Sequence, residues 1–422
     1  MRLQTRPEHH LTYCSNIHPG ESWQEVFEQL RRYLPGLKNR LADGRPMGVG
    51  LRLSAQSAEE LVQPDKLSEF DRWLDEEGLY LFTMNGFPYG SFHRQRVKEQ
   101  VYAPDWRTPE RVAYTSNLIA ILSGLLPQDV DGGISTSPLS YKYWMSDEVE
   151  REETFRESAR NLAICAFEMA NIHNDQGKEL HLDIEPEPDC LLENSRETID
   201  YFQRFLLPVG STYLKKEFGI SPDEGERILR EHIRVCYDTC HFAVEYENPE
   251  EAVSSLINAG IKIGKVQISA ALRVPKPNTE EERKRIAERL QTFAEPVYLH
   301  QVIERRKDGS LRQFRDLPQA LPHFGEEEME EWRIHFHVPI FTDRYEEGGK
   351  ERDAIGGEII STQRDILASL PVLLRQTSCR HYEVETYTWE VLPPSLKGDL
   401  SESIYRELRW ASEQLEESAG RR

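Results

Sequence analysis

The segment HLDIEPEPD, residues 181–189, alternates apolar and acidic side chains and then meets two prolines. This alternation predicts a short β-strand with Leu182 and Ile184 on one face and two carboxylates on the other. Pro186 cannot donate a hydrogen bond to a sheet, so the strand should end at Glu185. A carboxylate at the carboxyl end of a parallel strand stands where α/β barrels place their chemistry.

Segments of strand character recur on both sides of this one, and helical segments separate them. The candidate strands are 11–18, 47–54, 79–85, 133–137, 181–185, 234–240, 263–269 and 381–387. Strand–helix alternation predicts a parallel sheet with right-handed crossovers, and eight such units close a barrel. A ninth candidate, 332–340, is assigned to an insertion after the seventh strand. If it joined the main sheet instead, the fold would be a nine-stranded open sheet.

We therefore expect one α/β domain spanning 1–422, a (β/α)8 TIM barrel with a large insertion at 270–357 after strand seven. Within the insertion, 298–306 and 310–314 flank a short turn and predict a β-hairpin. The glycine pairs at 348–349 and 356–357 indicate a loose loop.

The composition narrows the class of function. The chain has 422 residues, with 52 Lys and Arg against 73 Asp and Glu, which gives a formal charge of −21. That balance argues against non-specific binding to nucleic acid or to anionic membranes, because both need basic surface. No segment approaches the ~20 consecutive apolar residues that span a bilayer, and the N-terminus lacks the apolar core of a signal peptide. We expect a cytoplasmic protein without stable membrane insertion, whose six cysteines stay reduced.

Acidic and amide side chains end four consecutive predicted strands. They are Glu185, Asp238, Gln267 and Glu385, and His241 follows Asp238 by three residues. Because the carboxyl ends of barrel strands meet at one rim, these oxygen donors should converge. Oxygen-rich sites suit Mg²⁺ or Mn²⁺. Such an ion can polarise the carbonyl and hydroxyl of a polyol while a carboxylate moves a proton on the neighbouring carbon.

Each member of this set also has a structural interpretation. A carboxylate at a strand end is often a cap or an ion-pair partner, and a lone histidine is often a packed or capping residue. Glu383 shares a strand face with Glu385, which we prefer because it lies nearer the carboxyl end. His335 and His337 point to one side of a strand and serve as ligands or as the rim of a pocket, although a hairpin of polar surface residues accounts for them equally well.

The ordered set Glu, Asp-x-x-His, Gln and Glu resembles the site of the xylose isomerase-like TIM-barrel superfamily. Longer segments resemble the metabolite traffic protein EboE family. They are LTYCSNIHPGESW at 11–23, GLRLS at 50–54, NGFPYG at 85–90 and HFHVP at 335–339. The resemblance covers nearly the whole chain and implies the same eight-stranded barrel.

The superfamily resemblance implies one divalent metal ion with Glu185, Asp238, Gln267 and Glu385 as ligands and with His241 facing the substrate. Mn²⁺ or Mg²⁺ is the expected ion, and Zn²⁺ and Fe²⁺ are the alternatives. Glutamine at the third position departs from the commoner histidine, although some dehydratase members have it.

The endonuclease IV members of the superfamily bind three metals through extra histidines on strands three and four. Those strand ends carry Asn85 and the serine–threonine segment 135–137 in this chain, which disfavours a trinuclear nuclease site. The pair His335 and His337 can be matched to an Asp-x-His pair of those members and offers a second set of donors.

We expect a metal-dependent isomerase or epimerase acting on a sugar-like or polyol metabolite. Glu185 and Glu385 would exchange protons with the substrate carbon, and His241 would hydrogen-bond a substrate oxygen. The EboE resemblance implies a place in a bacterial metabolite traffic (ebo) pathway. The candidate substrate-binding residues are Asn16, His18, Arg52, Asn85, His93, His335 and His337.

Other functions stay open at this point. A non-catalytic metabolite-binding or export accessory protein would keep the barrel pocket without turnover. A metal-dependent dehydratase fits the glutamine at position 267, whereas a nuclease is disfavoured by the acidic charge. The expected partners are a small-molecule metabolite and, at the protein level, a second copy of the chain or other pathway proteins.

Overall fold

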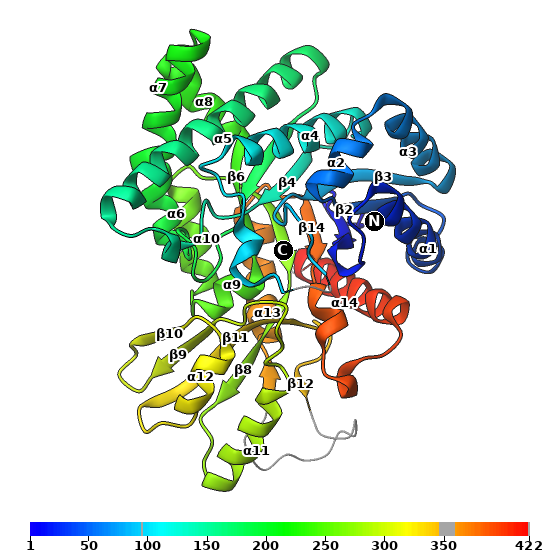
Figure 1. Cartoon of the computed structure of the whole chain (residues 1–422). Helices are drawn as coiled ribbons and strands as arrows, with labels where there is room; N and C mark the ends of the chain where they lie inside the picture. The colour runs from blue at the N-terminus through cyan, green and yellow to red at the C-terminus, as the bar shows by residue number, and fades with distance from the viewer. Residues whose placement is uncertain (94–95, 346–358, 421–422) are drawn as a thin grey trace.

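A computed structural model describes residues 1–93, 96–345 and 359–420, and Figure 1 shows a parallel sheet at its centre. The sheet has eight strands, in the spatial order β1 (His10–Tyr13), β14 (His381–Val384), β7 (Ile263–Ile268), β6 (Ile233–Asp238), β5 (Leu180–Ile184), β4 (Gly132–Thr136), β3 (Leu79–Asn85) and β2 (Met47–Arg52). The two ends of this order meet at a parallel bridge between Cys14 and Gly50, which closes the sheet into a barrel. The predicted (β/α)8 barrel is therefore confirmed, and the nine-stranded open sheet is wrong.

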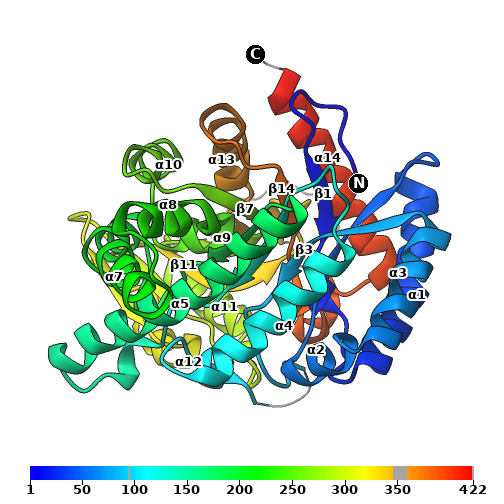
Figure 2. The ribbon, with the colours of Figure 1, turned by 90° about the horizontal axis from the view of Figure 1, so that it is seen from above.

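Helices surround the barrel when the molecule is seen from above (Figure 2). They are α1 (Trp23–Leu41), α2 (Ala55–Leu61), α3 (Pro64–Glu77), α4 (Pro109–Leu125), α5 (Glu148–Gln176), α6 (Ser195–Tyr201), α7 (Leu207–Phe218), α8 (Pro222–His232), α9 (Thr239–Val244), α10 (Pro249–Asn258), α13 (Gln363–Gln376) and α14 (Leu400–Gly420). Ser22, Asp147 and Ser221 cap α1, α5 and α8 by accepting a hydrogen bond from a backbone N–H of the first turn. Within the described residues, no helix combines the length and the apolar content that crossing a membrane requires.

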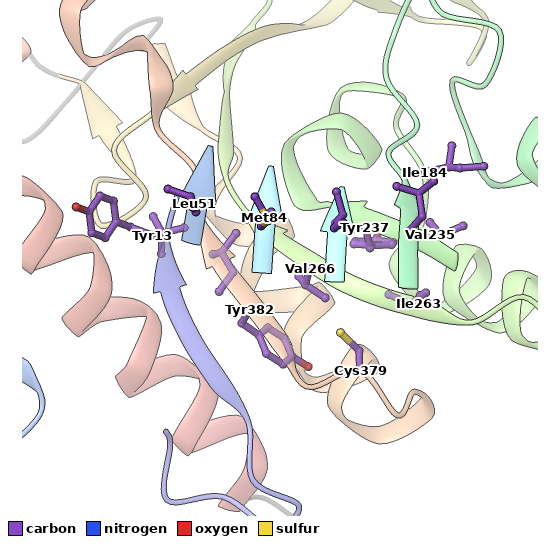
Figure 3. Packing of buried hydrophobic residues seen from close by; sticks show 14 of the residues in the cluster. Tyr13, Leu51, Met84, Ile184, Val235, Tyr237, Ile263, Val266, Cys379 and Tyr382 are labelled. Carbon is purple, nitrogen blue, oxygen red and sulfur yellow. The ribbon is translucent and has the colours of Figure 1, made fainter. Parts of the chain in front are cut away.

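The interior of the barrel holds buried polar side chains, and the apolar residues that alternate with them on β7 point outward to the helices. Lys265 on β7 donates to the backbone carbonyl of Met84 (3.3 Å) on β3 and to Oγ of Ser135 (3.4 Å) on β4. Because neither strand is a neighbour of β7, this side chain crosses the interior. Val266 and Ile268, at the alternate positions, face outward into the apolar core. Figure 3 shows members of that core on the strands, including Leu51, Ile184, Val235, Val266 and Tyr382.

The seam of the barrel depends on the absence of a side chain at Gly50. A Cβ atom there would lie 2.6 Å from the carbonyl oxygen of Tyr13 and 2.8 Å from Cγ2 of Thr12, and it would also meet the Glu383 carboxylate. The Thr12 hydroxyl donates across the seam to the carbonyl of Gly48 at 2.9 Å. Glycine therefore lets β1 and β2 approach closely enough to close the sheet.

A second sheet follows β7 and occupies the lower part of Figure 1. Its strands are antiparallel, in the order β10 (Leu311–Phe314), β9 (Val302–Arg306), β11 (Met329–Val338), β8 (Ala270–Pro275), β13 (Ile359–Ser361) and β12 (Arg344–Tyr345), and it carries α11 (Glu280–Gln291) and α12 (Leu317–Ala320). The predicted hairpin is confirmed as the β9–β10 pair. The loop predicted at the glycine pairs 348–349 and 356–357 lies outside the described residues.

The C-terminal helix α14 is tied to both sheets by a buried carboxylate. Oε1 of Glu407 accepts hydrogen bonds from the hydroxyl of Thr386 (2.7 Å) and from the backbone N–H of Ile340 (3.3 Å). Thr386 follows β14 and Ile340 follows β11, so one oxygen holds the ends of a barrel strand and of a strand in the second sheet. Burial raises the pKa of Glu407 to about 7, although both hydrogen bonds lower it.

Gly50→Ala is expected to destabilise the fold by about 3 kcal/mol, because backbone on both sides of the seam would have to move. The control is Gly36→Ala in α1, where a Cβ atom meets nothing within 4 Å. There the higher helix propensity of alanine should add about 0.5–1 kcal/mol. Urea unfolding followed by circular dichroism measures both changes. A Gly50→Ala variant as stable as the wild type would show that the seam is not tightly packed.

Glu407→Gln is expected to remove a pH-dependent part of the stability. Because the folded-state pKa exceeds the unfolded-state value, the contribution of Glu407 is complete at acidic pH and is lost as pH rises through about 7. Glutamine keeps an oxygen acceptor without a charge. The variant should therefore match the wild type near pH 4, below the unfolded-state pKa, and exceed it by up to about 3 kcal/mol near pH 8. Urea unfolding at the two pH values tests this, and an unchanged difference between them would contradict the raised pKa.

Candidate functional site

A cavity lies where the carboxyl ends of the barrel strands meet the second sheet. Three carboxylates line it, those of Glu185, Glu187 and Glu385. Its other walls are mainly aromatic and include Phe87, Phe92, Tyr102, Tyr298 and Tyr387. Because Tyr298, Leu299 and His335 belong to the insertion, the second sheet and its connections form one side of the cavity.

Glu185, Asp238 and Glu385 converge at the base of this cavity, and we call them the carboxylate set. One oxygen from each lies within 4.8 Å of the others, and all three residues are buried. Burial, and then the neighbouring carboxylates, raise the pKa of Glu185 and of Glu385 well above the ordinary value. Oε2 of Glu185 and Oδ2 of Asp238 have no hydrogen-bond donor among the described residues. Three buried acids with unpaired oxygens fit a divalent cation, which would stabilise their ionised forms.

Asp238 is held in place by the start of the helix that follows it. Its Oδ1 accepts hydrogen bonds from the backbone N–H groups of Cys240 (2.7 Å) and His241 (3.2 Å), and also from the hydroxyl of Ser269. The strand end thus doubles as the N-cap of α9. With Oδ1 committed to these donors, Oδ2 is the oxygen that faces the site.

Two predicted pocket residues position Glu385. Asn16 and Asn85 each donate a side-chain N–H to Oε1 of Glu385, at 2.7 Å and 2.9 Å. The amide of Asn85 is itself oriented, because its Oδ1 accepts from the backbone N–H of Phe87 at 3.1 Å. These contacts hold one oxygen of Glu385 and leave the other to face the carboxylate set.

Glu383 lies one layer deeper than Glu385 and does not line the cavity. Its Oε2 pairs with Nζ of Lys265 at 2.6 Å, and both side chains are fully buried. Gln267 is in register with Asp238 on one side and with Glu383 on the other. Neither polar atom of its buried amide has a hydrogen-bond partner within the described part of the chain. The structure thus leaves the Gln267 amide beside Asp238 with its bonding capacity unused.

Two histidines near the carboxylate set have defined tautomers. Nδ1 of His241 lies 2.9 Å from the carbonyl of Pro186, and Nδ1 of His337 lies 2.8 Å from the backbone carbonyl of Glu385. Because a carbonyl only accepts, each Nδ1 carries the proton and donates it. In the neutral ring the lone pair is then on Nε2.

Gln301 fixes the tautomer of a third histidine, His335. The side-chain nitrogen of Gln301 lies 3.2 Å from the carbonyl of Pro188, so that end of the amide must be the donor. Its Oε1 therefore faces His335 and accepts from Nδ1 at 2.8 Å. The same amide donates to the hydroxyl of Tyr102 at 3.3 Å. His335 consequently also presents an unprotonated Nε2.

The three unprotonated nitrogens of His241, His335 and His337, the imidazole set, lie next to one another. Nε2 of His241 is 3.2 Å from Nε2 of His335, and Oδ2 of Asp238 is 3.8 Å and 4.0 Å from Nε2 of His241 and His337. Burial lowers the pKa of His241 and of His335, and it lowers that of His337 to about 4. Neutral imidazoles with converging lone pairs are metal ligands or acceptors for a substrate hydroxyl. Asp238 is a member of the carboxylate set, and it also forms a group of possible metal ligands with His241 and His337.

Glu187 is a further acid in the cavity that the sequence reasoning did not assign a role. Its Oε1 accepts from the hydroxyl of Tyr102 at 2.9 Å and lies 3.6 Å from Nδ1 of His335. Burial raises its pKa to about 8, with the Tyr102 hydrogen bond acting in the opposite direction. A signal was present, because Glu187 follows Glu185 by two residues in the same segment. Tyr102 and Gln301 had no comparable local signal.

The remaining predicted substrate-binding residues lie elsewhere. His18 and Arg52 line a separate small cavity, where His18 stacks on Tyr33 and Arg52 donates to the carbonyls of Gly20 (3.2 Å) and Gly90 (2.5 Å). His93 packs edge-on against Phe92, whose ring does line the main cavity. Of the predicted set, the structure thus brings Asn16, Asn85 and His335 to the cavity and His337 to its base.

Comparison with models of known protein families gives no match, and neither does comparison with curated protein sequences. Among solved structures, the IolI protein with a binding zinc atom has a TM-score of 0.46 and 11% identity, over 97% of this chain and 98% of that chain. A xylose isomerase-like TIM barrel protein from Mycobacterium smegmatis, in complex with magnesium, gives 0.47 and 8%, over 97% and 98%. The probable 3-DHS dehydratase AsbF from Bacillus anthracis gives 0.44 and 10%, over 96% and 98%. The EboE resemblance stays a prediction.

Lys265→Met is expected to destabilise the protein by about 3–5 kcal/mol, because it leaves the carboxylate of Glu383 buried without its ion-pair partner. Adding Glu383→Gln to that variant should recover part of the loss, because the uncompensated charge is then removed as well. A double-mutant cycle measured by urea unfolding should give a coupling energy of about 2 kcal/mol or more. Additive single effects would mean that the two side chains do not depend on each other.

Proposed function

We propose that this protein is a divalent-metal-dependent isomerase or epimerase acting on a sugar-like or polyol metabolite. The observation that carries the proposal is the carboxylate set, which is buried at the base of a cavity and adjoins three neutral imidazoles. Such a concentration of buried acid is costly unless a cation and a reaction use it.

The proposed ligands are Glu185, Asp238 and Glu385, with the unpaired amide oxygen of Gln267 as the fourth. This donor set consists of oxygen atoms and suits Mn²⁺ or Mg²⁺, whereas involvement of the adjoining imidazole set would favour Zn²⁺ or Fe²⁺. When bound, the ion supplies a Lewis acid that polarises a carbonyl or hydroxyl oxygen of the substrate.

The chain's own groups would move the proton. In an isomerase or epimerase, a carboxylate takes a proton from a carbon next to a carbonyl and returns it to the neighbouring carbon or to the opposite face. Glu185 and Glu385 are the expected acid–base pair, and Glu187 is a third carboxylate that faces the cavity without belonging to the ligand set. Nε2 of His241 lies at the cavity and can accept a substrate hydroxyl proton in a hydrogen bond.

The walls of the cavity favour an uncharged substrate. Among the described residues that line it, Lys98 is the only Lys or Arg, and its Nζ is paired with Asp316 at 2.6 Å. Arg52, one of the predicted substrate-binding residues, uses its guanidinium on backbone carbonyls instead. Aromatic walls above an acidic floor suit the apolar faces and hydroxyl groups of a neutral polyol better than a phosphorylated sugar.

Two other functions have support in the same site. A dehydratase would need the same metal and proton acceptor, and Gln267 was its signal in the sequence. A non-catalytic metabolite-binding protein of a bacterial metabolite traffic (ebo) pathway would use the cavity without turnover. A nuclease is disfavoured by the charge of −21 and by the acidic cavity.

The decisive measurement is metal content together with turnover. The wild type, incubated with Mn²⁺ and desalted, should keep about one ion per chain at this site. It should also exchange a proton on the carbon next to the carbonyl of a neutral aldose or ketose for deuterium in D2O, followed by NMR. Glu185→Gln/Asp238→Asn should lose that ion and reduce exchange by at least about 10²-fold.

The matched control is Glu168→Gln, a half-buried carboxylate on α5 that accepts from Ser116 at 2.7 Å, far from the cavity. It should change neither metal content nor exchange. Metal binding without exchange on any neutral aldose or ketose would move the assignment to the binding protein. A wild type that holds no ion at the carboxylate set would contradict the assignment as a metalloenzyme.

A further inference from the structure

A second cluster of ligand-type side chains lies at the opposite, amino end of the barrel. Asp131 precedes β4, His181 lies on β5 and His381 begins β14. One ligand atom from each lies within 4.8 Å of the others. Two strands, β6 and β7, separate β5 from β14 along the sheet order, so the two imidazoles meet across the barrel interior.

Three of the four ring nitrogens of His181 and His381 have no hydrogen-bond partner among the described residues. His381 is fully buried, and neither ring nitrogen makes a hydrogen bond within the described residues. Nδ1 of His181 lies 2.7 Å from Oδ1 of Asp183, so it carries a proton and donates it to the carboxylate. Nε2 of His181 is likewise without a hydrogen bond in the described part of the chain. A buried imidazole oriented by a carboxylate at its other nitrogen is the usual arrangement of a metal-bound histidine.

The spacing of the three side chains fits a shared ion better than direct hydrogen bonds. Nε2 of His181 lies 3.6 Å from Oδ2 of Asp131, and Nε2 of His381 lies 3.3 Å from Oδ1 of the same carboxylate. Two ligand atoms about 2.1 Å from one metal at a tetrahedral angle are about 3.4 Å apart. The observed separations bracket that value.

Two glycines make room for the cluster. A Cβ atom on Gly133 would lie 2.6 Å from the ring of His181 and 2.9 Å from Nδ1 of His381. A Cβ atom on Gly264 would lie 2.6 Å from Nδ1 of His181 and would also meet the carboxylate of Asp183. Any other residue at these positions would displace the imidazoles, so the sequence keeps space for them on two further strands.

The surroundings of the cluster allow a cation to bind and to enter. Arg234 is the nearest cation, 4.0 Å from Asp131, and its guanidinium is shared with Glu179 and Glu231. Asp183 adds a second buried carboxylate behind His181. Asp131 is 21% exposed, so a ligand position beside it opens to solvent at the amino end of the barrel.

We propose that Asp131, His181 and His381 form a second metal site, for Zn²⁺ or a similar transition-metal ion, at the amino end of the barrel. Two imidazoles and one carboxylate suit such an ion, with water at the fourth position. The site would fasten β5 to β14 across the interior. It is independent of the reaction proposed for the main cavity at the carboxyl end of the barrel.

The test separates the two sites by substitution. A triple variant removes a ligand from each of the four candidate groups at the main cavity; it carries Asp238→Asn, His241→Gln and His335→Gln. This triple variant, incubated with Zn²⁺ and desalted, should keep about one Zn²⁺ per chain. Adding His381→Gln or Asp131→Ala should lower the content to near zero. With Co²⁺ in place of Zn²⁺, the triple variant should show the visible absorption of a tetrahedral site, and adding His381→Gln or Asp131→Ala should abolish it.

The control is His232→Gln, another buried histidine at this end of the barrel, whose Nδ1 donates to the carbonyl of Leu180 at 2.7 Å. It should leave the metal content unchanged. Asp131 lies at the rim, so Asp131→Ala decides the matter if a substitution of a buried histidine prevents folding. The proposal would be overturned if the folded triple variant binds no Zn²⁺, or if its Zn²⁺ remains bound after Asp131→Ala is added. Either result would leave the cluster as an ion-pair network.

Discussion

The constraint on which the structure depends is the cost of placing charge inside a closed barrel. Apolar residues such as Val266 face the helices, and polar side chains such as Lys265 and Gln267 occupy the alternate, inward positions. Each charge there has to find compensation, because an unpaired buried ion costs several kcal/mol. The middle layer solves this with the Lys265–Glu383 pair, and that pair lies directly beneath the cavity. The layer above it has three carboxylates and amide donors but no buried cation among the described side chains that contact it, which is why its function and its electrostatics are linked.

The second sheet and the site depend on each other. Ser269, between β7 and β8, donates to Asp238, so the residue immediately before the insertion helps to orient a member of the carboxylate set. β11 then returns His335 and His337 to the same place, and Gln301 on the adjoining segment fixes the His335 ring. A barrel without the insertion would keep its carboxylates but lose the imidazole set and one aromatic wall. The insertion is thus part of the site and also its cover.

The sequence allowed the fold and the carboxylate set to be predicted because both follow local rules. Strand–helix alternation predicts the barrel, and Pro186 marks the position at which Glu185 leaves the strand. The preference for Glu385 over Glu383 agrees with the cavity lining, although Lys265, the reason for the difference, could not be identified as a partner. The second sheet was foreseen only as a hairpin with one further strand, because antiparallel pairing between distant segments has no local signal. Tyr102 contacts Glu187 and Gln301 across segments far apart in the sequence, so their relation could not be predicted from local patterns.

Asp238 lies between the carboxylate set and the imidazole set at the base of the main cavity. Its Oδ1 is occupied by the start of α9 and by Ser269, so Oδ2 alone faces both Glu185 and Glu385 on one side and the imidazoles on the other. A cation among the carboxylates would draw on this oxygen and weaken its attraction for a second cation at the imidazoles. The histidines would then remain neutral acceptors beside the metal, which is the state in which they can bind substrate hydroxyl groups. On this argument one ion and three free imidazoles form a more consistent site than two ions sharing a single oxygen.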